Sequence, residues 1–256
     1  MLLKTLVNYK RKMFLVIFMK HNLDLGQHFM TDEELLKRIA KISEIRPTDA
    51  VLEIGSGKGA LTKHLHAAKP KSLTCIEKDP RFILPVPSKL ITGDALDELK
   101  HVTFNKVVAN IPYHISEPLF IKLLLKKPER MILVVGKKFA QKLLEDTIVG
   151  LIARGAYEVR LVETISKESF FPLPKTQSAL IIATLKPTVA AKVLIPFYTH
   201  QRQKVKNYIL TVSEGIWTKR EIRERMVGLG DLLTKQLYTL NTKEFAQLYA
   251  FLLTLV

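Results

Sequence analysis

Four consecutive residues, Asn110-Ile111-Pro112-Tyr113, combine groups that could modify the exocyclic amine of an adenine. The Asn110 side-chain oxygen and the Pro112 backbone carbonyl can accept the two N–H hydrogens of that amine. Holding both hydrogens favours a pyramidal nitrogen whose lone pair points at an electrophilic methyl group, while Tyr113 stacks on the base. The motif therefore predicts methyl transfer that depends on positioning and preorganised polarity, without a strong general base.

By itself, the same motif is also typical of an Asn-x-Pro turn with a packed tyrosine, because asparagine and proline are common turn formers. Its place in the chain favours the catalytic interpretation. Residues 106–109 read as a buried strand, so Asn110 would lie at the carboxyl edge of a sheet, where α/β proteins bind their ligands. The adenine would have to be unpaired, or turned out of its stack, to enter such a pocket.

A glycine turn and two acids at successive strand ends predict a cofactor site. Residues 50–54 read as a buried strand that runs into Gly55-Ser56-Gly57, where the glycines let a ligand approach the backbone. Glu77 ends the next strand, where a carboxylate can accept hydrogen bonds from a ribose, although an exposed acid is the alternative there. Asp94 ends the third strand and could hold an adenine amine. The turn alone leaves NAD or FAD open, but the Glu-x-Gly-x-Gly form and Asp94 favour S-adenosylmethionine.

Strand and helix patterns alternate along most of the chain and predict an α/β fold, a parallel sheet with helices on both faces. The expected strands are residues 50–54, 72–76, 88–92, 106–109 and 131–135, followed by an antiparallel pair, 157–165 and 178–185. The expected helices among them are residues 31–45, 60–68, 117–125, 139–145 and 148–154. A small C-terminal helical domain is expected from residue 187, with helices at 193–212, 219–226, 229–238 and 243–254.

The charge balance indicates a polyanionic partner. The 256 residues include 40 Lys+Arg against 24 Asp+Glu, a formal net charge of +16. A basic surface that neutralises phosphates releases counterions, so such an excess favours nucleic-acid binding. The alternative, a basic surface that only confers solubility, does not require so one-sided a charge.

The single cysteine, Cys75, excludes an intramolecular disulfide and a cysteine-based metal site. Its apolar neighbours predict a buried thiol, and we expect no metal and a reducing, cytoplasmic setting. Residues 1–22 form a basic and apolar extension whose apolar run, 13–19, is far shorter than the about 20 residues needed to span a bilayer. No small-residue cleavage site follows, so a translation start at Met19 explains the extension better than a signal peptide does.

Together these motifs resemble the KsgA-type rRNA adenine dimethyltransferases, from about residue 23 to the C-terminus. Residues 25–30 resemble the family's Gly-Gln-Asn/His-Phe-Leu signature, and residues 52–57, 76–79, 93–95 and 110–113 resemble its next four motifs. Residues 169–179 are similar to its Phe-x-Pro-Pro-Pro-Lys-Val-x-Ser-Ala segment, and residues 200–207 to a basic C-terminal helix that meets RNA. For that helix, a solvated charged face is an almost equally good interpretation.

The resemblance implies a Rossmann-like class I methyltransferase sheet, with an extension at 1–22, a catalytic domain at 23–186 and a helical RNA-contacting domain at 187–256. It implies S-adenosylmethionine as cofactor, and two methyl groups transferred to each of two adjacent adenines near the 3′ end of small-subunit rRNA, late in ribosome assembly. We expect a monomer that acts on the pre-ribosomal small subunit, without a membrane. Phe170 is expected to stack on the base opposite Tyr113. The implied cofactor contacts are Gln27, His28, Met30, Gly55, Gly57, Glu77, Asp94 and Asn110.

Some positions depart from the family pattern, and these departures are expected to affect substrate reach and RNA contacts more than cofactor binding. Residues 80–89 are short and rich in proline where relatives have a full helix, and residues 145–151 also look shortened. Ser56 and Leu173 stand where proline is usual, and Gln203 stands where arginine is expected.

Two other functions stay open. Antibiotic-resistance enzymes that methylate large-subunit rRNA also use Asn-Ile-Pro-Tyr, although Gln27-His28 and residues 170–178 point away from them. Protein glutamine and DNA adenine methyltransferases typically carry a second proline in place of Ile111, which argues against these activities. A non-catalytic rRNA-binding assembly factor is the remaining alternative, which the intact Asn110 and Tyr113 argue against.

Overall fold

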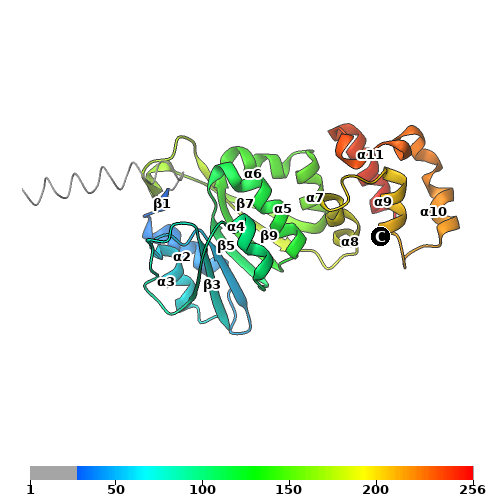
Figure 1. The fold of residues 1–256 in the computed structure, drawn as a ribbon. Helices are drawn as coiled ribbons and strands as arrows, with labels where there is room; N and C mark the ends of the chain where they lie inside the picture. Colours follow the sequence, from blue (N-terminus) through cyan, green and yellow to red (C-terminus); the bar gives the residue numbers. More distant parts are fainter. Residues whose placement is uncertain (1–27, 256) are drawn as a thin grey trace, which may run out of the picture.

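A seven-stranded sheet forms the centre of residues 28–255, the part of the chain that the computed structural model describes (Figure 1). The strand order is β4-β3-β2-β5-β6-β9-β7; β2 to β6 run parallel, and β9 pairs antiparallel with both β6 and β7. The predicted α/β class and the antiparallel final pair are therefore confirmed. The strands are β2 (Ala50–Ile54), β3 (Ser72–Glu77), β4 (Lys89–Thr92), β5 (Lys106–Asn110), β6 (Arg130–Gly136), β7 (Tyr157–Ile165) and β9 (Ser178–Leu185).

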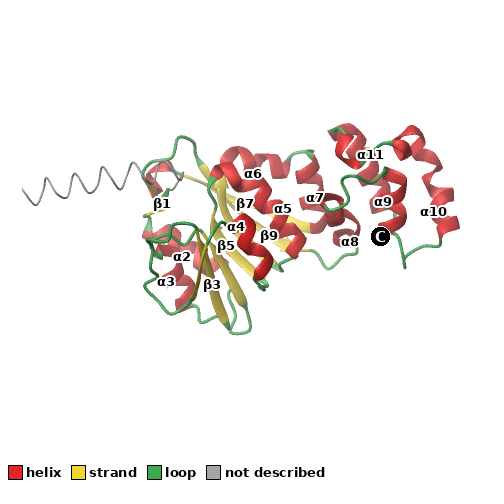
Figure 2. Cartoon of the chain, viewed as in Figure 1, coloured by secondary structure: helices red, strands yellow, loops and turns green. Residues whose placement is uncertain are grey.

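Helices cover both faces of this sheet (Figure 2). Successive side chains of a strand point to opposite faces, and Val107 and Val108 accordingly belong to two different hydrophobic clusters. Central strands buried on both faces need continuous apolar runs, which is why they could be recognised in the sequence. One cluster includes α2 (Glu33–Ile42) and α3 (Ala60–Ala67), and the other includes α4 (Ala95–Glu98), α5 (Ser116–Lys126), α6 (Lys137–Leu144) and α7 (Ile148–Ala156).

A short second sheet joins β1 (Phe29–Met30) to β8 (Phe170–Phe171) in antiparallel register. The start of α2 holds this sheet in place. The Asp32 carboxylate caps α2 by accepting a hydrogen bond from the Leu35 N–H at 3.0 Å, and it also accepts one from the Ser169 hydroxyl at 3.0 Å. One cap residue therefore fixes both the beginning of α2 and the chain that enters β8.

The connection between β3 and β4 contains no helix in the described structure, in line with its prolines. It packs on the glycine turn after β2 instead. A Cβ added to Gly59 would lie 2.3 Å from Pro85, and the Phe82 ring meets the Phe29 ring edge-on at 5.6 Å. This short connection therefore supports the loops at the carboxyl edge of the sheet.

Residues beyond the sheet fold into α8 (Ala190–Leu194), α9 (Val205–Val212), α10 (Lys219–Met226) and α11 (Thr242–Leu253), with 3-10 turns between them. The predicted helix 193–212 is wrong as one element. The Pro196 carbonyl accepts a hydrogen bond from the Thr199 hydroxyl at 2.9 Å and lies 2.8 Å from the His200 ring, which ends the turn locally. The predicted helix 229–238 is also wrong, because Gly230 has non-helical backbone angles and only 3-10 turns form there.

These C-terminal helices share their core with the sheet. One hydrophobic cluster continues from β5 through α7 into α8 and α11. Gly155 in α7 allows the close approach, since an added Cβ would lie 2.3 Å from Leu194 and 3.0 Å from Tyr249. A domain boundary at residue 187 stays a prediction, and the packing across it is continuous.

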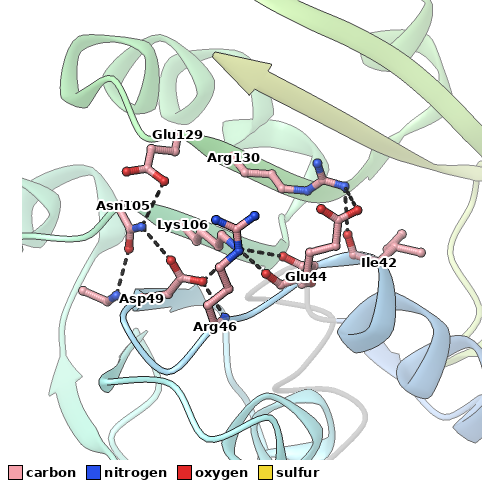
Figure 3. Close-up of polar contacts among 10 residues, drawn as sticks. Ile42, Glu44, Arg46, Asp49, Asn105, Lys106, Glu129 and Arg130 are labelled. Atoms are coloured by element: carbon pink, nitrogen blue, oxygen red, sulfur yellow. Dashed lines mark hydrogen bonds and ion pairs between the residues drawn. The ribbon is translucent and has the colours of Figure 1, made fainter. Parts of the chain in front are cut away.

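A buried polar cluster, here called the amino-edge network, lies at the edge of the sheet where β5 and β6 begin (Figure 3). The Lys106 ammonium pairs with the Asp49 carboxylate at 2.8 Å, and both side chains are less than a tenth exposed. The Asn105 amide donates to the same carboxylate at 2.8 Å. Lys106 also donates to the carbonyl of Glu44, and Arg130 donates to that of Ile42 at 3.1 Å. Cations from the sheet thus satisfy the free carbonyls at the end of α2.

Within residues 28–255, no helix combines the length and the apolar character that crossing a bilayer requires.

Candidate active site

A cavity of about 700 Å³ opens at the carboxyl ends of β2 and β5. Strand order reverses between these two neighbours, and ligands of open α/β sheets bind at such a switch point. Most of the predicted site residues line it: His28, Met30, Gly55, Gly57, Glu77, Asp94, Asn110, Pro112 and Tyr113. Phe170 does not, and Gln27 lies outside the described residues. No group of three metal-ligating side chains occurs among residues 28–255.

The glycine turn forms one wall of the cavity. Gly55 and Gly57 have φ values of 75° and 51°, a region that favours glycine. A Cβ on Gly55 would lie 3.2 Å from the Asn110 carbonyl oxygen, and a Cβ on Gly57 would lie 2.9 Å from the Phe29 ring. The turn therefore runs in close contact with Asn110 at one point and with β1 at another, leaving its backbone open to a ligand.

Glu77 holds the turn in place from the end of β3. Its carboxylate is buried and accepts hydrogen bonds from the Gly57 N–H at 2.7 Å and from the Asp79 N–H at 2.9 Å. A carboxylate has about four acceptor positions, so it can still accept the hydroxyls of a ribose. The structure excludes the alternative of an exposed strand-end acid.

Two further acids near the turn have pKa values shifted in opposite directions. Burial raises the pKa of Glu53, which lies in β2 just before the turn, to about 7, and the buried Cys75 thiol lies 3.5 Å from its carboxyl group. A hydrogen bond from Lys78 lowers the pKa of Asp94, which also accepts from the Leu96 N–H at 2.9 Å. Asp94 is thus a charged acceptor that lines the cavity, and its role toward an adenine stays a prediction.

The Asn110 amide is oriented by the chain that precedes β1. Its Nδ2 donates a hydrogen bond to the His28 carbonyl at 2.9 Å. With its nitrogen occupied in this way, the side-chain oxygen remains as an acceptor for a substrate N–H. Asn110 ends β5, and the Ile111 N–H continues the pairing with β6 by donating to the Val134 carbonyl at 2.9 Å.

The acceptor role predicted for the Pro112 carbonyl needs correction. That oxygen accepts a hydrogen bond from the Ile115 N–H at 3.1 Å and one from the Ser116 hydroxyl at 3.3 Å, because the chain turns into a 3-10 helix there. Both acceptor positions of the carbonyl are then used. The Ile111 carbonyl accepts no backbone hydrogen bond from the residues that the structure describes, and Ile111 lines the cavity.

Three elements hold the Tyr113 ring. Its hydroxyl hydrogen-bonds with that of Ser178, which is fully buried at the start of β9. The His28 ring stacks on it with centroids 6.0 Å apart, and a Cβ on Gly136 would lie 3.3 Å from its Cγ. Burial raises the pKa of Tyr113, so the phenol stays neutral. Ser178 was not predicted as a site residue, although it belongs to the segment 169–179 that resembled the family.

The position predicted for Phe170, facing the ligand, is occupied by its neighbour Phe171. Phe170 pairs with Met30 and is only 3% exposed, inside the cluster that covers α2 and α3. Phe171 is 41% exposed and lines the cavity. Successive side chains of a strand point in opposite directions, so only one of the two phenylalanines can face the ligand.

Comparison with known proteins decides the family. Residues 18–208 match the family model described as "Ribosomal RNA adenine dimethylase". The chain belongs to this family. It is therefore an S-adenosylmethionine-dependent adenine methyltransferase, and its substrate is ribosomal RNA.

Several relatives agree with this family assignment. A "Probable ribosomal RNA small subunit methyltransferase A" of Thermococcus sibiricus is 36% identical over 182 residues, 66% of each chain. One of the same name from Methanococcus aeolicus is 31% identical over 260 residues, 90% of this chain and 96% of that one.

Two solved structures share the fold of this chain. The dimethyladenosine transferase of Plasmodium falciparum has a TM-score of 0.61 at 22% identity, covering 86% of this chain and 96% of that one. The 23S rRNA methyltransferase ErmE has a TM-score of 0.57 at 21% identity, covering 88% and 99%. The predicted Rossmann-like class I methyltransferase fold is confirmed.

The cavity of this chain fits S-adenosylmethionine. The open glycine backbone, the buried Glu77 carboxylate at the next strand and a cavity within the usual volume range for small ligands are what a nucleoside with a polar tail requires. Gly55 and Gly57 would lie along the cofactor, Glu77 would accept from its ribose, and Asn110 would lie at the end where the methyl group leaves. When bound, the cofactor supplies an activated methyl group.

Replacing Glu77 by glutamine should weaken S-adenosylmethionine binding at least about tenfold, as measured by calorimetry. The Glu77 carboxylate now accepts hydrogen bonds from two backbone N–H groups. In the glutamine variant the amide nitrogen would face one of these donors, and this unfavourable contact would disrupt the turn as well as the ribose contact. Asp97→Asn, at an exposed acid on α4, is the matched control. Equal affinities of the Glu77 variant and the unmodified enzyme would contradict the assignment.

Proposed function

We propose that this enzyme dimethylates two adjacent adenines near the 3′ end of small-subunit rRNA. The proposal further includes the pre-ribosomal small subunit as the physiological substrate, a cytoplasmic location and a monomeric enzyme. The observation that carries it is the Asn110 side-chain oxygen, which the His28 carbonyl leaves available as an acceptor at the carboxyl edge of the sheet. The names of the archaeal relatives support the small subunit as the target.

The residues of the cavity suggest how the amine is made reactive. The Asn110 side-chain oxygen and the Ile111 carbonyl accept the two N–H hydrogens of the adenine amine, which makes its nitrogen lone pair available. Tyr113, held by Ser178 and His28, supplies one face for the base and Phe171 a second. Neither acceptor is a strong base, so the proton leaves only after the methylated nitrogen has become cationic. Catalysis is then mainly a matter of orientation.

Two rounds of transfer to one nitrogen place a requirement on these acceptors. The first transfer replaces one amine hydrogen with a methyl group, so a single N–H remains for the second. The Asn110 oxygen is oriented by a hydrogen bond within the protein and does not depend on the substrate for its position. It can therefore hold the remaining hydrogen in the second round.

The substrate is tested by incubating the enzyme with labelled S-adenosylmethionine and each ribosomal subunit in its unmethylated form. We expect label in two adjacent adenines of the small-subunit rRNA, and mass spectrometry of the nucleosides should identify dimethyladenine. Label only in large-subunit rRNA, or none while binding persists, contradicts the proposal. Sedimentation of the enzyme, with and without the subunit, tests whether the enzyme is a monomer.

Replacing Phe171 by alanine should lower kcat/KM for rRNA by about 10- to 100-fold, because stacking on an aromatic ring contributes about 1–3 kcal/mol per base. Cofactor affinity should not change. Phe171→Tyr keeps a ring and should retain most of the activity. Phe170→Leu is the matched comparison and should lower the unfolding temperature instead, because Phe170 lies in the core. If Phe170→Leu reduced RNA turnover in a stable protein and Phe171→Ala did not, the assignment would be reversed.

A further inference from the structure

Two segments of the C-terminal region lie side by side and present an exposed tyrosine among basic side chains. Lys204 and Gln236 form an antiparallel bridge. The Leu237 N–H donates to the Gln203 carbonyl at 3.0 Å, and the Tyr238 N–H donates to the Gln201 carbonyl at 3.1 Å. Residues 201–204 and 235–238 are thus joined through their backbones, although more than 30 positions separate them in the chain.

Burial divides the side chains of these segments into two sets. Val205 and Leu237 are buried in the core and anchor the pair. Arg202, Lys204 and Tyr238 are exposed, and Tyr238 is 61% exposed. We call these three residues the Tyr238 platform. A large aromatic side chain left this open contributes little to the core and is accessible to a binding partner.

The charge around the tyrosine favours a polyanion. The adjacent Lys235 pairs with Glu244, whereas neither Arg202 nor Lys204 forms an ion pair with any residue from 28 to 255. Two exposed cations without carboxylate partners lie on a segment whose backbone is hydrogen-bonded to the segment that carries Tyr238. An unpaired nucleotide matches this arrangement, because its base stacks on an aromatic face and its phosphates attract cations.

We propose that the Tyr238 platform binds an unpaired nucleotide of the rRNA, with the base stacked on Tyr238 and the neighbouring phosphates held by Arg202 and Lys204. This inference rests on the proposed function for the identity of the RNA. None of the three residues lines the methyl-transfer cavity, so the platform acts on the affinity for RNA and not on the chemical step. It also replaces the predicted basic helix at 200–207, since residues 200–204 form a turn.

The test compares the full-length variants Y238A and Y238F for rRNA binding and for steady-state methylation. Y238A should raise the Kd and the KM for rRNA about tenfold, with kcat at saturating RNA unchanged. Y238F keeps the ring and should stay within about twofold of the unmodified enzyme. V227A, which shortens another exposed apolar side chain of the same region, is the matched control and should have no effect.

The salt dependence tests the cations separately. The R202A/K204A double variant should lower the slope of log Kd against log salt by about 1.5, as expected for two lost phosphate contacts. Y238A should leave that slope unchanged, because stacking releases no counterions. K71A, an exposed lysine at the opposite, amino edge of the sheet, should not change the slope measurably.

Three results would overturn the platform: Y238A binds rRNA as tightly as the unmodified enzyme, Y238F loses as much affinity as Y238A, or Y238A weakens binding to the intact subunit but not to deproteinised rRNA. The last would identify a protein as the partner. Failure of the proposed function looks different, since the label would then enter another RNA. The same variants measured on that RNA would still decide whether Tyr238 binds a nucleotide.

Discussion

Replacing Asn110 by alanine is expected to lower kcat by at least about 10³-fold while leaving rRNA binding largely intact. In the proposed mechanism the side-chain oxygen, oriented by the bond to His28, holds the adenine amine for attack, and a preorganised polar contact of this kind typically contributes about 10²–10³ in rate. The same side chain also orients the amine, and the loss of this orientation lowers the rate further. Methylation under single-turnover conditions, with rRNA binding measured in parallel, provides the test.

Two variants distinguish catalysis from structure at this position. Asn110→Asp keeps an oxygen acceptor but replaces the donor to the His28 carbonyl with a second oxygen, so it should also be inactive. Gln141→Ala removes an exposed amide side chain from α6 and should retain full activity. If Asn110→Ala lost rRNA binding together with turnover, Asn110 would have to be regarded as a structural residue of the turn.

Replacing Lys106 by alanine should lower the free energy of unfolding by about 3–5 kcal/mol, because it leaves the Asp49 carboxylate buried without its cation. It also removes the donor to the Glu44 carbonyl at the end of α2. Urea unfolding measures the loss. Lys37→Ala breaks a pair with Glu34 in which both side chains are more than half exposed, and it should cost less than about 1 kcal/mol. Equal losses from Lys106→Ala and Lys37→Ala would show that the amino-edge network contributes no special stability.

The same pair predicts how stability depends on acid. Burial alone would raise the pKa of Asp49, but hydrogen bonds from Lys106, Asn105 and the Arg46 N–H outweigh it and lower the pKa. A pKa below the unfolded value of about 3.9 means that the folded state binds the proton less readily. This contribution is complete above that value and is lost as the pH falls through the folded-state pKa. The acid side of the stability profile should therefore be flatter in Lys106→Ala than in the unmodified protein.

Local patterns were sufficient to predict the strands and the cofactor turn. Buried strands such as β2 and β5 require continuous apolar runs, and a turn that brings backbone close to a ligand requires glycine. These requirements act within a few residues, so they are visible in the order of amino acids. The placement of Gly55, Glu77 and Asn110 at strand ends follows directly from them, and the structure brings all three to one cavity.

Contacts between distant segments decided the details that the pattern could not. Pairing of β1 with β8 turns Phe170 into the core and Phe171 toward the cavity. The C-terminal region shows the same limit, because helical periodicity at 193–212 gave no sign that α8 would stop at Leu194, or that side chains would hydrogen-bond with the Pro196 carbonyl in the 3-10 turn that follows.

The order of amino acids by itself was therefore sufficient to recognise the family and to predict the cofactor turn and the proposed amine acceptor Asn110, since each depends on residue type at a strand end. Only the tertiary structure showed that hydrogen bonds within the protein occupy the Pro112 carbonyl, and that Ser178 contacts Tyr113 from 65 residues away. It also placed Tyr238 beside Gln201. The physical reason is that a hydrogen bond or a facing direction depends on the position of both partners, and the fold alone supplies the position of the distant one.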